Sequence, residues 1–478
     1  MGTMHEAPAG LGAAPLHADA RFRADPLADA AIARILCGCE GEARYDAIAL
    51  VNREIAAWTT NGVLDGWRAG PATPARIAAA LEDYVRAARV LPAWADPARI
   101  GAAETVFVEM SMLSCTLLFC ASLPECYVPV DLASVLHTAG QLEQHTDYRV
   151  RSTAAMIFPV MLRGGLTSPA GGGVAQVLKV RLIHATIRHL ILRGNPASVM
   201  AGADPAALLA TLPAEGQGLH RALYARGWDV RRHGLPINQD ELAYTLLTFH
   251  YVFLRSLRRL GLGLTPAEED AYLHGWNVVG HLLGIEPGLL AQDMAAAEAL
   301  FARLQARGRD AADGALPYGA QDPRPALARA LMQAMEDEIP LRLLKPFPTL
   351  LTRFLCGRRN ARELGLLGPV ATVSHALFVV LMGALRGIDF LVRLLVPGFS
   401  ISRLVSRVLG YRLTVKLLMD QTRPLKLPEA LLNGVAQAVQ DWHHDPQAPA
   451  WMNRLELRLR PRAPTATNAT TATSVKAG

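Results

Sequence analysis

The stretch from Leu178 to Leu190, LKVRLIHATIRHL, places one histidine within an apolar helical face. On an α-helix, His184 shares that face with Val180 and Ile187, because residues three and four apart lie on one side. An imidazole in this position could carry a proton, bind a metal or ligate haem iron. It could also be a core histidine hydrogen-bonded to a carbonyl, since buried polar groups usually have partners. Taken alone, the helix favours the core histidine.

Cationic side chains border this face. Arg181 and Arg188 lie three residues before and four residues after His184. Arg149 and Thr153 form a second pair, four residues apart on one face of a predicted upstream helix. An arginine that faces an apolar stripe needs an anionic partner, because an unpaired buried cation is costly. An acidic residue elsewhere or the carboxylate of a bound cofactor would supply that partner.

The motifs of several common chemistries are absent from the sequence. It contains no GxSxG, P-loop, GxGxxG or HExxH pattern, and no glutamate is followed three residues later by the histidine that di-iron bundles use. Cys37 and Cys39 form CxC, not the CxxC spacing of zinc sites. His274 and His281 share a helical face, but two turns separate them by roughly 10 Å. We therefore predict that these two histidines are polar-face or supporting residues and do not share a metal.

The amino-acid composition limits which kinds of protein this chain can be and which partners it can bind. The 478 residues are 51% hydrophobic and 19% charged, enough to bury a large core. The net charge of +6 is modest and the arginines are scattered, so nucleic acid is not indicated as a partner, whereas weak attraction to an anionic membrane is compatible with it. Six cysteines are sparse and fit a reducing compartment. The first 25 residues do not resemble a secretory signal, which predicts a cytoplasmic protein.

Helical periodicity runs through the chain, and alternating strand patterns are nearly absent, so we predict an all-α fold. The helices that position the candidate residues are expected at Glu143–Leu162 and Val174–Leu192, joined by the glycine-rich loop RGGLTSPAGGG. Asn238 and Thr265 should cap later helices. We expect a loose segment at 1–25, the main helical domain at 26–308, a surface loop at 309–325, a helical region packed on the core at 326–458 and a disordered tail at 459–478.

The segment from Leu364 to Leu385 carries no charge over 22 residues, which raises the question of a membrane span. Glycines and a proline break its start, and charged residues line one face just beyond it, so an amphipathic helix fits better. Such a helix could pack on the core or lie at a membrane interface. The residues that support this interpretation are Gly365, Gly368, Pro369, Arg386, Asp389 and Arg393.

Several blocks, in order, resemble the family of the rubber oxygenase (latex-clearing protein) catalytic domain, which also includes the ER-bound oxygenase of mycophenolic acid biosynthesis. They are RVRST at Arg149–Thr153, the glycine-rich loop, VRLIHATIRHL from Val180, GLPINQDELAYTLLTF and AYLHGWNVVGHLLG, within Cys115–Gly284. The resemblance implies a globin-like helical core around a buried pocket for haem b. It also implies that His184 is the proximal ligand of the iron and that Arg149 and Thr153 lie near its distal side.

The resemblance further implies the use of dioxygen, and the rubber-cleaving members split isoprenoid C=C bonds into carbonyl products. Rubber oxygenases carry a lysine immediately before the distal threonine, whereas this chain has Ser152, so we expect the distal position to be open or water-filled. The distal glutamate of the rubber oxygenases has no compelling counterpart, although Glu125 and Asp131 lie in the right neighbourhood.

These observations together predict a haem b oxygenase that acts on a hydrophobic, isoprenoid or lipid-like substrate with dioxygen. Arg149 would orient the oxygen side or pair with a propionate, and Thr153 would donate a hydrogen bond there. Arg181 and Arg188 are candidates for propionate pairing. Two alternatives stay open: a haem-free hydrophobic-ligand-binding protein, associated with a membrane through Leu364–Val396, and a haem protein that senses or stores a diatomic gas. The sequence leaves the product, the redox partner and the oligomeric state undetermined.

Overall fold

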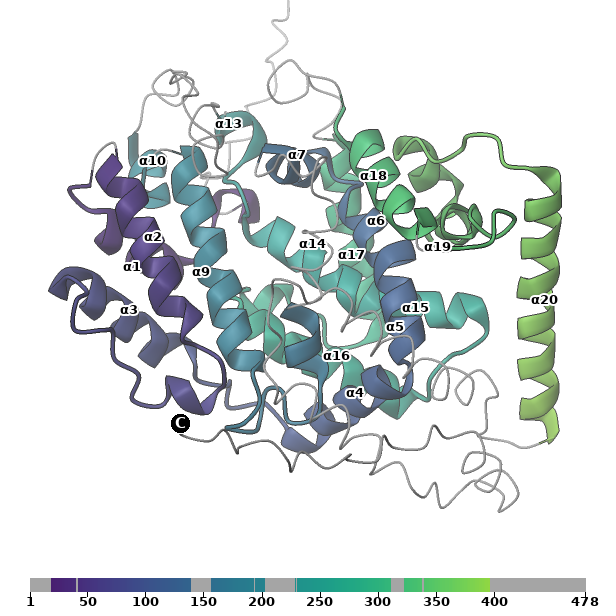
Figure 1. Ribbon diagram of the computed structural model, residues 1–478, viewed down its shortest axis with the longest axis horizontal. Coiled ribbons are helices and arrows are strands. Elements are labelled where there is room, and N and C mark those ends of the chain that lie inside the picture. The colour runs from purple at the N-terminus through teal and green to yellow at the C-terminus, as the bar shows by residue number, and fades with distance from the viewer. Residues whose placement is uncertain are drawn as a thin grey trace, which may run out of the picture.

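The computed structural model describes residues 19–39, 42–138, 156–192, 194–202, 228, 230–310, 322–337 and 339–395. The secondary structure of these residues is helical and includes no strand, which confirms the predicted all-α class. Figure 1 shows α9, α14 and α16 in the middle of the molecule, with α1 to α3 on one side and α18 to α20 on the other.

The helices have the following bounds in chain order: η2 Ala20–Phe22, α1 Pro26–Leu36, α2 Glu42–Ala56, η3 Gly62–Leu64, α3 Ala75–Ala88, α4 Pro97–Glu109, α5 Ser111–Leu117, the π-helix η4 Leu118–Ser122, α6 Leu123–Cys126, α7 Val130–Thr138, α9 Gly173–Leu192, α10 Pro196–Gly202, α13 Val230–His233, α14 Gln239–Phe249, α15 Tyr251–Leu260, α16 Pro266–Leu282, η5 Pro287–Leu289, α17 Met294–Asp310, α18 Arg324–Asp337, α19 Phe347–Glu363 and α20 Thr372–Leu395.

Local signals in the sequence determine several of these helix ends. The Asn238 side chain accepts a hydrogen bond from the Glu241 N–H at 3.0 Å, and Thr265 forms a complete capping box with Glu268, so both predicted caps are confirmed. Gly261 ends α15 with a φ of +81°, a conformation that glycine adopts without strain. The apolar periodicity that follows Asn238 continues to Leu260 and predicts one helix, but the backbone breaks at His250, so this stretch forms the two helices α14 and α15.

The core is built from close helix pairs. Helix α4 packs along α16, and Gly275 permits the approach, since a Cβ there would lie 2.8 Å from the Cβ of Ala103. Helix α1 packs against both α3 and α9. On the other side of α16, Trp276 stacks on Phe249 with ring centroids 5.4 Å apart. The result is a continuous apolar core that holds α9 between α1 and α16.

The glycine-rich loop sets the entry into α9. Asn61 ties the loop together: its Nδ2 donates to the carbonyls of Gly165 and Ser168, and its Oδ1 accepts from the Val174 N–H at 3.0 Å. Gly171 is needed for close approach, because a Cβ there would lie 2.2 Å from the Gly164 carbonyl oxygen. The direction of α9 is therefore fixed by backbone contacts at its first turn.

The predicted domain limits need one correction at the N-terminal end. Residues 19–25 pack on the core, with Phe22 5% and Asp25 2% exposed, so the expectation of a loose segment over 1–25 is wrong for this part. The expected loop at 309–325 falls between the end of α17 and the start of α18, and its central part lies outside the described residues. The predicted tail and residues 396–458 also lie outside them.

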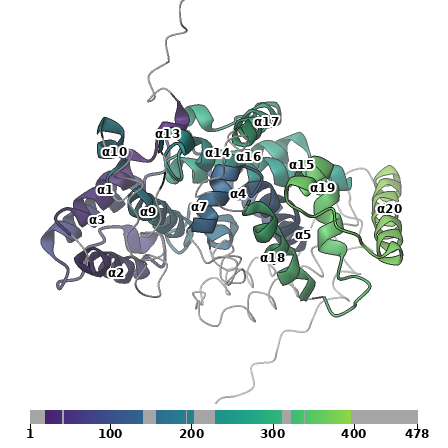
Figure 2. The ribbon, with the colours of Figure 1, turned by 90° about the horizontal axis from the view of Figure 1, so that it is seen from above.

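Helix α20 runs along the edge of the molecule beside α19 (Figures 1 and 2). The uncharged stretch predicted from Leu364 is divided: Leu364 and Leu366 are buried, and the helix begins only at Thr372. Within the described ranges, no single helix is long and apolar enough to cross a membrane. One pair of helices bent by 87°, Pro97–Glu109 with Leu113–Cys126, is together long and apolar enough when judged by length and composition alone.

Candidate functional site

His184 lies in the middle of α9 on the predicted apolar stripe. Val177 and Ile191 at the two ends of this stripe are buried, whereas Val180, His184 and Ile187 between them are only partly buried. Arg181 and Arg188, which border this stripe, are more deeply buried and bind Asp25 and Asp29 at the N-terminal end of α1. The histidine therefore lies on the side of the helix that the protein covers less completely.

The Nδ1 atom of His184 is buried and has no hydrogen-bond partner among the residues that the structure describes. Burial, assisted by the positive charge of Arg188, lowers the pKa of this imidazole to about 4, so the ring is neutral near pH 7. An unsatisfied buried nitrogen costs about 1–3 kcal/mol. This finding disagrees with a core histidine that a carbonyl of the described residues holds at that nitrogen, and it is compatible with a bound cofactor as the partner of the ring.

A metal bound at this histidine would need further donors. Over the ranges that the structure describes, no group of three His, Cys, Asp or Glu side chains could hold a metal ion. Haem iron needs only an axial ligand from the protein, because the porphyrin supplies the other four nitrogens. A single neutral imidazole with a free nitrogen therefore fits haem better than it fits a protein-only metal site.

The two arginines that flank His184 bind the protein itself. Arg181 donates to Asp25 through Nε and Nη2, at 2.5 and 2.7 Å, and to the Leu282 carbonyl through Nη1 at 3.0 Å. Arg188 is fully buried and donates to Asp29 at 2.5 Å and to the carbonyls of Pro236 and Ile237. The predicted propionate contacts are thus replaced by ion pairs to α1, and all three guanidinium nitrogens of each arginine have protein acceptors.

The other candidates have different outcomes. Arg149 and Thr153, with Ser152, lie outside the described residues, so their distal role stays a prediction. His274 accepts a hydrogen bond from the Asp96 N–H at 2.9 Å and, like His281, meets the edge of the Trp94 ring, in agreement with the supporting role predicted for both histidines. All six cysteines are free thiols.

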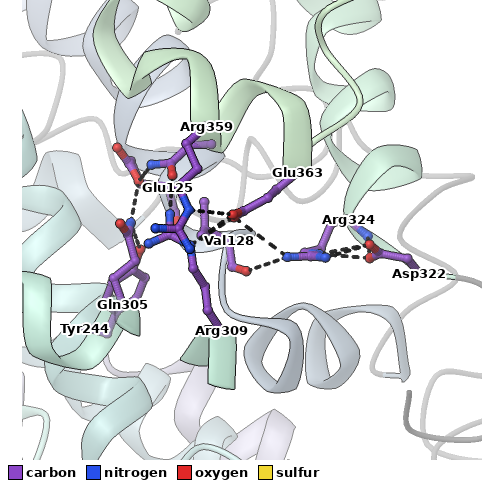
Figure 3. Close-up of polar contacts among 10 residues, drawn as sticks. Glu125, Val128, Tyr244, Gln305, Arg309, Asp322, Arg324, Arg359 and Glu363 are labelled. Carbon is purple, nitrogen blue, oxygen red and sulfur yellow. Dashed lines mark hydrogen bonds and ion pairs between the residues drawn. The ribbon is translucent and has the colours of Figure 1, made fainter. Parts of the chain in front are cut away.

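Glu125, considered above as a base, is the centre of a buried polar cluster (Figure 3). Its carboxylate is fully buried and accepts hydrogen bonds from Arg255 at 2.6 Å, Asn360 at 2.7 Å and Gln305 at 2.9 Å. Because both oxygens are engaged and the donors come from α15, α17 and α19, the cluster joins the C-terminal helices to the core. This arrangement gives Glu125 a structural role.

The sequence did not reveal a second titratable site, around Glu241. One carboxylate oxygen of Glu241 accepts from the Ile237 N–H at 2.7 Å, and the other is buried without a partner in the described part of the chain. Burial, together with the negative charge of Asp131, raises the pKa of Glu241 to about 8. Asp131, the second residue considered as a base, pairs with His233 at 2.9 Å. The only sequence signal for this site was the capping pattern that begins at Asn238.

This second site is connected to the histidine helix. Ile237 has a φ of +55°, a strained value for a β-branched residue, and its carbonyl is held by Arg188, one helical turn after His184. A pocket that is partly open to solvent lies beside Glu241. Arg188 therefore links the helix of the candidate ligand, the strained turn and the buried carboxyl group.

A second pocket, lined mainly by apolar side chains and partly open to solvent, lies against the π-helix. Leu118 and Ser122 of that helix line it together with Phe249 of α14 and Trp276 of α16. π-Helical turns are rare and are frequently found at functional sites. A pocket lined mainly by apolar and aromatic side chains suits a hydrophobic ligand. Its full lining is Phe107, Ser114, Cys115, Leu118, Ser122, Ile157, Phe158, Phe249, Phe253, Tyr272 and Trp276.

The fold and these sites define an all-α protein with an unsatisfied histidine and an apolar ligand pocket. Comparison with protein families matches residues 111–387 to "ER-bound oxygenase mpaB/B'/Rubber oxygenase, catalytic domain". This match covers more than half of the chain, and the protein belongs to that family. The matched region begins at α5, includes His184, runs past the predicted boundary at 308 and ends within α20.

Two individual relatives agree with this assignment. The chain is 23% identical over 229 residues to the rubber oxygenase of Streptomyces sp. (strain K30), an alignment that covers 47% of this chain and 48% of the relative. The chain thus matches about half the length of that protein. The fold resembles the solved structure of latex clearing protein LCP in the closed state, with a TM-score of 0.55 and 18% identity, over 77% of this chain and 85% of that chain.

Proposed function

We propose that this protein is a haem b-dependent oxygenase that uses dioxygen to oxidise a hydrophobic, isoprenoid or lipid-like substrate. Membership in a family of oxygenases supports the reaction class. The observation that carries the cofactor assignment is the buried Nδ1 of His184, for which the described part of the chain offers no partner. The apolar pocket beside the π-helix supports a hydrophobic substrate.

In this proposal, haem, when bound, supplies dioxygen binding and the electron chemistry of the oxidation. The protein positions the cofactor and excludes water from the site. His184 offers a neutral imidazole, and the pairs of Arg181 with Asp25 and of Arg188 with Asp29 fix α9 on α1. Arg149 and Thr153 are proposed to act on the opposite side.

Substitution of the candidate ligand tests the proposal directly. The protein is expressed in haem-supplemented cells as wild type, His184→Ala and the matched control His281→Ala, which removes a partly buried histidine on α16. We expect a Soret band in the wild type and the control, and its loss or a marked shift in His184→Ala, with equal helicity by circular dichroism. An unchanged Soret band and haem content in His184→Ala would show that the ligand is assigned wrongly.

The same preparation separates the alternatives. A haem-free hydrophobic-ligand-binding protein would show no Soret band in the wild type. A gas sensor or store would show the band, but it would not consume dioxygen when an isoprenoid or lipid substrate is added. The proposed oxygenase shows both the band and substrate-dependent dioxygen consumption.

A further inference from the structure

Exposed apolar side chains gather at one end of the molecule. Of the twelve large hydrophobic residues that are exposed in the described ranges, eight lie between Leu341 and Leu381, in or beside α19 and α20. Val373 and Val380 of α20, seven residues apart on one helical face, are 64% and 65% exposed. The eight residues are Leu341, Leu343, Phe354, Leu367, Val373, Val379, Val380 and Leu381.

The same segment accounts for the net positive charge of the protein. Residues 339–395 contain eight Lys or Arg and two Asp or Glu, a net charge of +6, which equals the net charge of the whole chain. The rest of the chain is therefore balanced, with 40 residues of each sign. Five of the arginines in this segment are exposed: Arg342, Arg358, Arg359, Arg362 and Arg386.

The apolar and basic residues belong to neighbouring elements. Phe347, at the start of α19, meets Phe378 in the middle of α20 edge to face, with ring centroids 5.5 Å apart, so this contact brings the segment 341–345, which directly precedes α19, near α20. At the other end, the Arg386 side chain approaches Gly261 at the end of α15. We call the eight exposed apolar residues and five exposed arginines the α19–α20 surface.

We propose that the α19–α20 surface docks on an anionic lipid bilayer, with α20 lying in the plane of the headgroups. The apolar part of α20, Thr372–Ala384, is shorter than the ~20 residues that a span requires. Arginines beside exposed apolar side chains are the composition that binds an anionic interface. A second copy of this chain is a poor occupant, because a symmetric contact would place net +6 against net +6.

Vesicle co-sedimentation of the full chain tests this docking. Vesicles of phosphatidylcholine alone are compared with vesicles that contain about 30% phosphatidylserine. We expect binding to the anionic vesicles that weakens as salt is raised. Arg358→Gln/Arg362→Gln should weaken the binding about 25-fold, at about five-fold for each cation.

A second variant pair tests the apolar contribution. Val373→Glu/Val380→Glu should weaken binding about ten-fold or more. Val90→Glu should leave it unchanged, because this 60% exposed valine follows two residues after the end of α3, a helix on the side of the molecule away from α20 (Figure 1). Absence of binding to anionic vesicles, or equal binding by Val373→Glu/Val380→Glu and wild type, would overturn the proposal. Self-association that Val373→Glu/Val380→Glu abolishes, without vesicle binding, would assign the surface to a second copy. None of these readouts depends on haem.

Discussion

Replacement of Arg188 by methionine separates a structural role from a cofactor-binding role. The substitution leaves the carboxylate of Asp29 and the carbonyls of Pro236 and Ile237 without their donor inside the core. Removal of one partner of a buried ion pair costs about 3–5 kcal/mol, because the other charge is left uncompensated. We therefore expect Arg188→Met to lower the free energy of unfolding of the haem-free protein by about 4 kcal/mol at pH 8.

The loss of unfolding free energy in Arg188→Met should depend on pH, because the Asp29 carboxyl group titrates. Burial already raises the pKa of Asp29 to about 6 even though Arg188 opposes the rise, so without the arginine this pKa rises further. A carboxyl group whose pKa is raised on folding is tolerated while it is protonated, and it destabilises the fold as the pH rises through its folded pKa. Arg188→Met should consequently be less damaging at pH 5 than at pH 8.

Urea unfolding at both pH values measures these effects. Asp29→Asn/Arg188→Met should be more stable at pH 8 than Arg188→Met alone, since no unpaired carboxylate remains. The matched control is Arg34→Met, which breaks an ion pair to Asp83 that is about half exposed and should cost less than about 1 kcal/mol. If Arg188→Met keeps wild-type stability without haem but no longer retains haem, Arg188 is a propionate partner and our structural assignment fails.

Two further substitutions test other parts of the fold. The folded pKa of Glu241 is about 8, whereas a glutamate ordinarily titrates near 4.5, so its contribution to stability, about 5 kcal/mol, is present below pH 4.5 and lost as the pH rises through 8. Glu241→Gln should lack that part of the decline in urea titrations from pH 5 to 9; an unchanged decline would refute the assignment. Gly171→Ala should destabilise the protein by more than about 2 kcal/mol in thermal unfolding, because a Cβ there meets the backbone, whereas Gly101→Ala on α4 has open space and should be neutral or stabilising. Equal melting temperatures for these two variants would contradict the close packing of the loop.

The helical class and several helix ends could be predicted because their causes are local. A capping residue such as Asn238 or Thr265 acts within three or four residues of its own position, and Gly261 ends its helix by its own conformation. The break at His250 was missed because the apolar periodicity continues across it. Periodicity records which face is apolar, not whether the backbone bends.

The partners of the site residues could not be read from the sequence for a different reason. Asp25 and Asp29 lie 156 and 159 residues before the arginines that they bind, and no local pattern marks such a pair. The helical stripe placed His184 among apolar residues, but it could not show that this face is only partly covered or that Nδ1 lacks a partner among the described residues. The unsatisfied oxygen of Glu241 was hidden in the same way behind its capping role.

The cluster around Glu125 has a consequence for the order in which the chain folds. The donors of this carboxylate follow it by 130, 180 and 235 residues, and the last of them, Asn360, belongs to α19. At typical rates of synthesis, roughly 10–50 s pass on the ribosome between the appearance of Glu125 and that of Asn360. During this interval, the carboxylate must remain hydrated, because a buried charge without its donors is costly. The region around α6 should therefore close late, and α19 acts as an element that completes folding.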